Sequence, residues 1–419
     1  YKRAGSVAVL AQYLAEANKN QYSGRSLGLA PTPLLAPQAA RDGAEASEDS
    51  SAGRVSETTV QVSGIDEPDI VKTDGKNIYI SKESPYYGRP MPMLRAEDAA
   101  RMMPDWQDPA TTAIVEAFPP EKLAVIGEIK EKGEMLLVKD AKMLIILAQP
   151  EIVAYDISTP KSPLKKWSFT LTNNTALITA RLLDNTFYLV TQTGFDRSQP
   201  CPYIPVTRGG VNISVPCGDI WVPARIEPVQ HAYTVLAINP KTGATAQSLS
   251  LAADGGVTTV SMFKNNLYLA TKSYTTPYDV LIDLTVKISS RYLSALALDK
   301  VKRIQGYDIS PAGKLSEITQ VIEAELAKLS PNEQLTAQTN LGNELTKQLD
   351  AKKRELDRTR VARISLPTLQ VAATGEVPGT LLNQFALDEY EGNVRVAVTV
   401  NANSFGWGMG GGESVNDVY

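Results

Sequence analysis

The pattern of apolar and polar positions divides the chain into a short helix, a polar linker and a long β region. Residues 4–20 place apolar side chains at helical spacing, which predicts a short N-terminal helix. Residues 21–55 are rich in Ala, Ser, Gly and Pro and carry an acidic patch, which predicts an extended tether. From residue 57 the pattern has a period of two, as in strands buried on one face.

One strand–turn–strand unit recurs through the β region. Alternating runs flank polar turns in residues 58–81, 134–147, 177–190, 257–270 and 383–400. Strands at residues 152–158, 233–239 and 303–310 follow three of these hairpins, and each ends in a Pro/Gly turn. Such meanders repeated in series predict an all-β chain folded as a β-propeller of four-stranded antiparallel blades. A pair of stacked β-sandwiches is the alternative.

Residues 315–360 break the β pattern and predict an inserted helical hairpin. Apolar residues recur there at helical spacing, and Ser330–Asn332 separates the two runs as a stop and a new N-cap. The hairpin either covers part of the propeller or binds a partner. Basic residues near its end are interpreted as a solvated helix face rather than a nucleic-acid patch: Lys352, Lys353, Arg354, Arg358, Arg360 and Arg363.

Composition narrows the class of protein. Of 419 residues 43% are hydrophobic, and 42 basic against 46 acidic residues give a net charge of −4, which does not favour nucleic acid or an anionic membrane. No apolar run is long enough to cross a bilayer. Residues 414–419 resemble a strand that is just beginning, so we expect the chain to be incomplete at its C-terminus, with any membrane anchor beyond it.

The two cysteines predict a disulfide and an exported protein. Cys201 and Cys217 bracket a proline-rich loop, and the chain has a single His, so a metal site there lacks ligands. A disulfide places the protein in an oxidising compartment, at the cell surface or outside the cell, with hot intracellular settings as the exception. Two glycosylation motifs, at Asn173 and Asn212, agree with export.

Four carboxylates lie close together in the sequence, three just before the first predicted β-turn and one within it. Asp66, Glu67, Asp69 and Asp74 supply oxygen ligands of the kind that calcium prefers, although Asp74 also fits a hairpin turn and Asp66 a strand end. Paired carboxylates for glycoside hydrolysis could come from the same group. No nucleophile motif accompanies His231 and no phosphate-binding loop is present, so the sequence shows no catalytic residues.

Residues 57–76, ETTVQVSGIDEPDIVKTDGK, resemble a motif of the secreted β-propeller domain family of archaea and bacteria, which is distantly related to WD repeats. The resemblance covers residues 57–419 and includes residues 153–158, 216–220 and 374–389. The sequence departs from the family pattern at Thr59 and Pro68, and its helical insertion is longer than the one in that pattern. The resemblance implies a propeller that continues with more blades than this chain holds, and it implies no catalytic residues.

These observations predict an N-terminal helix and tether in residues 1–56 and an incomplete propeller in residues 57–419, with the helical insertion at 315–360. We expect a non-enzymatic cell-surface scaffold for protein binding or envelope assembly, with no cofactor other than the candidate calcium. Its expected partners are a protein or envelope component and the remainder of the propeller. The alternatives are a surface-glycan hydrolase with carboxylates at the propeller mouth and a purely structural envelope subunit.

Overall fold

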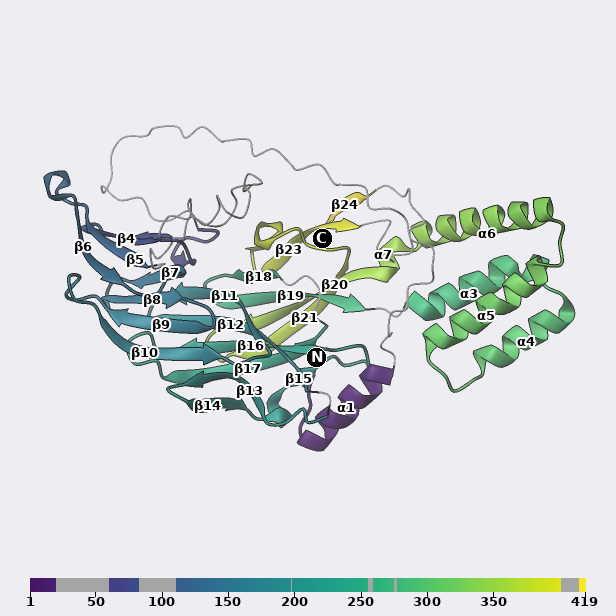
Figure 1. Ribbon diagram of the computed structural model, residues 1–419, viewed down its shortest axis with the longest axis horizontal. Helices are drawn as coiled ribbons and strands as arrows, with labels where there is room; N and C mark the ends of the chain where they lie inside the picture. Colours follow the sequence, from purple (N-terminus) through teal and green to yellow (C-terminus); the bar gives the residue numbers. More distant parts are fainter. Residues whose placement is uncertain (20–59, 83–110, 197, 255–258, 275–276, 401–413) are drawn as a thin grey trace, which may run out of the picture.

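The computed structural model describes residues 1–19, 60–82, 111–196, 198–254, 259–274, 277–400 and 414–419. Within these ranges the chain forms five sheets, an N-terminal helix and a group of helices that projects from one side (Figure 1). The predicted tether at residues 21–55 lies outside the described residues.

The central strands of the sheets follow one another in chain order and are antiparallel to their neighbours, whereas β1 (Lys2–Arg3), β2 (Ile65–Asp66), β13 (Tyr203–Arg208) and β14 (Val211–Val215) join a sheet out of this order. The first sheet contains β3 (Val71–Thr73), β4 (Asn77–Ser81), β5 (Thr112–Glu116) and β6 (Ala124–Ile129). The second contains β7 (Glu134–Val138), β8 (Met143–Leu147), β9 (Glu151–Asp156), β10 (Leu164–Leu171), β13 (Tyr203–Arg208) and β14 (Val211–Val215).

The third sheet is the widest, because short strands extend both of its edges. Its core strands are β11 (Thr175–Leu183), β12 (Thr186–Gly194), β16 (His231–Ile238) and β17 (Thr245–Ala253), with β2 (Ile65–Asp66) on one edge and β15 (Trp221–Val222) and β1 (Lys2–Arg3) on the other. The fourth contains β18 (Thr259–Met262), β19 (Asn266–Tyr274), β20 (Asp357–Ser365) and β21 (Gln370–Pro378). The fifth contains β22 (Leu387–Tyr390), β23 (Asn393–Val400) and β24 (Val415–Val418).

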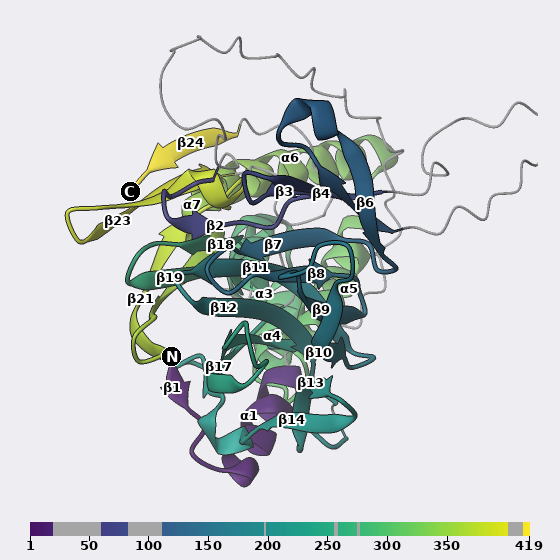
Figure 2. The same ribbon diagram turned by 90° about the vertical axis from the view of Figure 1, so that its left-hand side faces the viewer.

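The inner sheets bury both of their faces, which is the packing of a propeller. Along β7, Met135 and Leu137 pack against the first sheet, whereas Leu136 and Val138 pack against the third. Similar apolar clusters join the third sheet to the fourth and the fourth to the fifth. Figure 2 shows the first sheet at the upper right and the fifth at the upper left, with the others between. The predicted propeller is therefore confirmed, and the alternative of paired β-sandwiches is wrong.

Turn chemistry fixes the hairpins inside the sheets. Glu391 and Gly392 link β22 to β23 with φ values of 52° and 78°, as a two-residue hairpin turn requires. Asp184 has a φ of 49° at the turn between β11 and β12. Polar residues and glycine tolerate this left-handed conformation best, which is why the polar turns seen in the sequence mark the hairpins correctly.

The helices of residues 277–356, named the helical arm from here on, have a hydrophobic core of their own. They are α3 (Pro277–Ser289), η3 (Ser290–Tyr292), α4 (Ala295–Gln305), α5 (Pro311–Leu326), α6 (Pro331–Ala351) and α7 (Lys353–Leu356). The predicted helical hairpin is α5 and α6, and Ser330 is the N-cap of α6, where it forms a capping box with Glu333.

Two predicted bounds of this insertion are wrong. Residues 303–310 are not a strand, because Val301 and Ile304 pack at helical spacing into the arm core and Ser310 caps α5. The insertion therefore begins well before residue 315. It also ends before residue 360, because Asp357 already pairs with Tyr274 in the fourth sheet.

The N-terminal part also departs in one place from the sequence prediction. Helix α1 (Val7–Lys19) forms as expected and packs on the third sheet and the 201–217 loop. The strand predicted for residues 58–65 is wrong over its described part, because residues 60–64 turn and Gly64 has a φ of 86°. Within the described residues, no helix combines the length and the apolar character that a membrane span requires.

Three further short helical turns lie in loops between strands: η1 (Pro120–Lys122), η2 (Cys217–Asp219) and η4 (Gln384–Ala386). The last of these precedes the first strand of the fifth sheet and brings Gln384 to the centre of the ring of sheets, where it meets residues of the first β segment.

Candidate functional site

Residues 60–74, named the hub segment from here on, join several sheets at the centre of the ring. Ile65 and Asp66 pair with the end of β11 in the third sheet, and Asp69 forms a bridge with Met135 of the second. The Gln61 side-chain amide donates hydrogen bonds of 2.8 and 3.0 Å to the carbonyls of Gln384 and Leu387, beside and within the fifth sheet. The segment that carries the family motif therefore acts as a structural tie.

A buried ion pair between Lys72 and Asp66 stabilises the bend of the hub segment. The Lys72 side chain is 3% exposed, and its ammonium donates hydrogen bonds of 2.6 Å both to Asp66 Oδ1 and to the carbonyl of Glu67. Asp66 Oδ2 also accepts from the backbone N–H of Leu137 at 3.4 Å. A buried ammonium needs such partners, and these oxygens supply them.

A second polar cluster links the hub segment to the third and fifth sheets. The Arg181 guanidinium of β11 lies 3.7 Å from Glu67 and donates a 2.5 Å hydrogen bond to the side-chain oxygen of Gln384. The Gln384 amide in turn donates to Glu67 Oε2 at 3.0 Å. Burial lowers the pKa of Arg181, while Glu67 acts in the opposite direction.

The remaining carboxylates predicted as calcium ligands have local protein partners. Asp74 accepts hydrogen bonds from the backbone of Lys76 and Asn77 and from the hydroxyl of Tyr79. Burial opposes ionisation of Asp74, but these hydrogen bonds hold its pKa below the ordinary value. Asp69 accepts from the backbone of Val71. Across the described ranges, no three His, Cys, Asp or Glu side chains are grouped to hold a metal, so the geometry does not support calcium at these four carboxylates.

The two cysteines form the predicted disulfide. Cys201 and Cys217 are bonded with their Cα atoms 6.3 Å apart, and the loop between them contains β13 and β14. Cys217 belongs to the apolar cluster in which α1 packs on this loop, and the partly buried Cys201 packs against that cluster. Of the predicted glycosylation sites, Asn173 lies in the turn after β10 and Asn212 in β14, and both are exposed.

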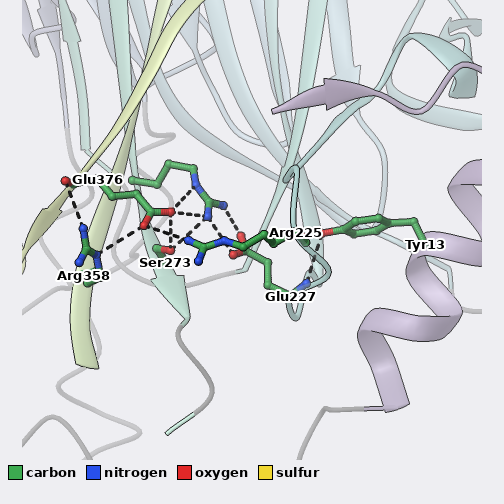
Figure 3. A network of polar contacts seen from close by, with 7 residues as sticks. Tyr13, Arg225, Glu227, Ser273, Arg358 and Glu376 are labelled. Atoms are coloured by element: carbon green, nitrogen blue, oxygen red, sulfur yellow. Dashed lines mark hydrogen bonds and ion pairs between the residues drawn. The ribbon is translucent and has the colours of Figure 1, made fainter. Parts of the chain in front are cut away.

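Charged residues gather where the helical arm leaves the fourth sheet (Figure 3). The buried guanidinium of Arg360 contacts both carboxylate oxygens of Glu227, one of them at 2.8 Å, and Glu376 Oε1 at 2.6 Å. Ser273 donates to the same Glu376 oxygen at 3.2 Å. We name Glu227, Ser273, Arg360 and Glu376 the arm-base network.

Neighbouring residues connect the arm-base network to the N-terminal helix. Arg225 and Arg358 lie 3.5 and 3.4 Å from Glu376, and the Tyr13 hydroxyl of α1 donates to the Arg225 carbonyl at 3.0 Å. Burial opposes the charge of Glu376, but Arg360 lowers its pKa below the ordinary value. Burial likewise disfavours the charged form of Arg360, yet Glu227 and Glu376 raise its pKa overall.

The interpretation of Arg358, Arg360 and Arg363 as part of a solvated helix face is wrong. All three lie on strand β20, and the Arg360 side chain is 8% exposed. The alternation of arginine with Thr359 and Val361 is the period-two signal that could have marked a strand. Nothing in the local sequence marks Glu227, which lies 133 residues away, as the partner of Arg360.

Antiparallel sheets that pack face to face in series around a central hub define a β-propeller protein. The profile of the family described as "Beta propeller domain" matches residues 55–419, and the chain belongs to this family. An archaeal relative named "Uncharacterized protein", from Archaeoglobus fulgidus, is 35% identical over 83% of this chain and 53% of its own length. "Uncharacterized protein MJ1554" from Methanocaldococcus jannaschii is 29% identical over 83% of this chain and 50% of its own. The chain thus spans about half the length of these relatives.

Proposed function

We propose that the protein is a non-enzymatic scaffold at the cell surface that binds a protein partner through the tip of its helical arm. The observation that carries this proposal is the way in which the arm is inserted. Tyr274 and Asp357 face each other as paired residues of β19 and β20, so the hairpin would be complete without the arm. A fold that does not need an insertion leaves that insertion free to serve binding.

The arm is also independent in its packing. The apolar cluster of the arm contains residues 281–356 alone, and none from the sheets. At its base the arm contacts the propeller through Arg354 of α7, which pairs with Asp417 of the fifth sheet at 2.8 Å. A helical unit with its own core, held at the base, can present its far end at a fixed angle.

Exposed leucines mark the far end of the arm as the binding surface. Leu296 is 80% exposed, Leu335 65% and Leu329 37%. The backbone N–H of Ser294, just before α4, donates to Glu325 near the end of α5, so these helix ends lie together at the tip (Figure 1). Exposed apolar side chains on a projecting end favour a protein partner over a small molecule.

We also propose that additional propeller blades pack against the first and fifth sheets. Large apolar side chains are exposed on or beside the first sheet, at Ile70, Val71, Phe118, Leu123 and Val125. Others are exposed on or beside the fifth, at Leu382, Phe385, Tyr390, Val418 and Tyr419. The equivalent faces of the inner sheets are buried against a neighbour, and the relatives have about twice the length of the match. Additional four-stranded sheets would cover both faces.

The proposed location rests on the disulfide and on the two exposed glycosylation motifs. It predicts that Cys201 and Cys217 are protected from alkylation when whole cells of the native source are lysed in the presence of a thiol-blocking reagent. Modification of both thiols in that experiment would contradict export.

The binding proposal is tested by changing the tip leucines. The variant L296S/L335S and the control L164S, a leucine 60% exposed on β10, are used as tagged full chains to capture cross-linked proteins from native envelope extract. We expect a defined protein that the unmodified chain and L164S recover equally and L296S/L335S recovers about tenfold less, since two apolar anchors are lost. Equal recovery by all three chains would contradict a binding role for the tip.

A further inference from the structure

A pocket with both polar and apolar walls lies beside the hub segment. It has a volume of about 300 Å³ and is formed by the hub segment together with the β7–β8 and β11–β12 turns. The turns contribute Lys139, Asp140, Asp184 and Asn185, and the buried Lys72–Asp66 pair forms part of the wall. Apolar residues at the ends of β7 and β11 complete it. We name this cavity the hub pocket.

The turn residues of the hub pocket differ from the other polar groups near the centre of the ring. Asp66, Glu67, Lys72 and Arg181 are all hydrogen-bonded or ion-paired within the protein. The side chains of Lys139, Asp140, Asp184 and Asn185 are exposed and make no hydrogen bond or ion pair with any described part of the chain. Their donors and acceptors are therefore available to a bound molecule.

The charges and spacing of these groups define the class of ligand. Two unpaired carboxylates against one ammonium leave a negative excess, which disfavours phosphate and other anions. A single metal ion is disfavoured as well, because within the described ranges no three acidic, His or Cys side chains are arranged to hold one. A neutral polyhydroxylated molecule can donate to Asp140 and Asp184, accept from Lys139 and Asn185, and rest its C–H face on the apolar wall.

We propose that the hub pocket binds a neutral carbohydrate unit. This inference is independent of the helical arm, because the arm contributes none of the residues that form the pocket. It makes the propeller a glycan-binding platform in addition to a protein scaffold.

The test uses the full chain and variants chosen to preserve the turns. D140A/D184G removes both carboxylates, and Gly suits position 184 because its φ is 49°. The matched control is E391G, which removes an exposed carboxylate from a hairpin turn with a φ of 52° in the fifth sheet. Asn185→Ala is a second pocket variant that keeps both carboxylates and carries the test if D140A/D184G fails to fold.

Binding is measured by saturation-transfer NMR and titration calorimetry with the methyl glycosides of glucose, galactose, mannose and N-acetylglucosamine, and separately with putrescine and inorganic phosphate. We expect at least one glycoside to bind the unmodified chain and E391G with equal affinity, and to bind D140A/D184G at least tenfold more weakly. N185A should weaken binding several-fold. The proposal is overturned if no glycoside binds, if only putrescine or phosphate binds, or if the pocket variants bind as well as E391G.

Discussion

Replacing Arg360 by Met tests whether the arm-base network stabilises the fold. Met fills part of the volume of the arginine stem but removes the guanidinium that contacts Glu227 and Glu376. Glu227 is 9% exposed, so the change leaves a nearly buried carboxylate without its cation. Removing one partner of a buried ion pair costs about 3–5 kcal/mol of unfolding free energy. The loss should lie at the lower end, about 3 kcal/mol, because Glu376 keeps Arg225 and Arg358 as partners.

The assay is equilibrium urea denaturation followed by the fluorescence of the four tryptophans. The control is R395M, since Arg395 is 53% exposed and pairs with an equally exposed Asp388, and its loss should leave the urea midpoint unchanged. In R360M/E227Q the unpaired charge is also removed, so the double variant should recover about 1–3 kcal/mol relative to additivity. Equal midpoints for R360M and R395M, or strict additivity in the double variant, would refute the reasoning.

Four further outcomes follow from the same contacts. The pKa of Glu376 is lowered in the folded protein, so the ionised carboxylate stabilises the fold above the ordinary pKa of 4.5. This stabilisation is lost as the pH falls through the folded pKa. The difference in unfolding free energy between the unmodified chain and R360M, measured in urea, should therefore shrink below pH 4.5. K72M should lower the unfolding free energy by about 3 kcal/mol or more in urea titrations, whereas K122M, in an exposed loop turn, should leave it unchanged. The double change C201S/C217S should lower the unfolding free energy by about 3 kcal/mol and make α1 sensitive to limited proteolysis. Proteolysis equal to that of the unmodified chain would contradict this prediction. S330A should lower the unfolding free energy by about 1 kcal/mol and speed amide hydrogen exchange in the first turn of α6, while exchange in the sheets stays unchanged.

Local signals in the sequence predict most of the hairpins. Apart from residues 60–64, which turn, the described runs around polar turns form strands, because the cause of that pattern, a sheet buried on one or both faces, acts over neighbouring residues. The same holds for α1, for the Ser330 cap and for the disulfide, whose cysteines lie 16 residues apart. These features depend on short separations, so a single chain displays them.

The arm and the charged sites could be predicted only in part. The sequence predicts the start of the arm too late because residues 303–310 resemble a blade strand, with Tyr307, Asp308 and Ile309 in the same order. The packing of Val301 and Ile304 in the arm core makes the start of this segment helical instead. The carboxylates of the hub segment looked like metal ligands because Lys72 and Arg181 are not visible as their partners until the chain has folded. Pairings between distant strands carry no local signature.

The arm-less chain provides the most direct test of a scaffold that binds through its arm. Residues 275–356 are replaced by Asn-Gly, which suits a two-residue turn between the paired Tyr274 and Asp357, and capture of the partner from native envelope extract is quantified against the full chain. The account predicts a chain with an intact cooperative thermal transition and β-sheet circular dichroism that no longer captures the partner. Undiminished capture by the folded arm-less chain would contradict it.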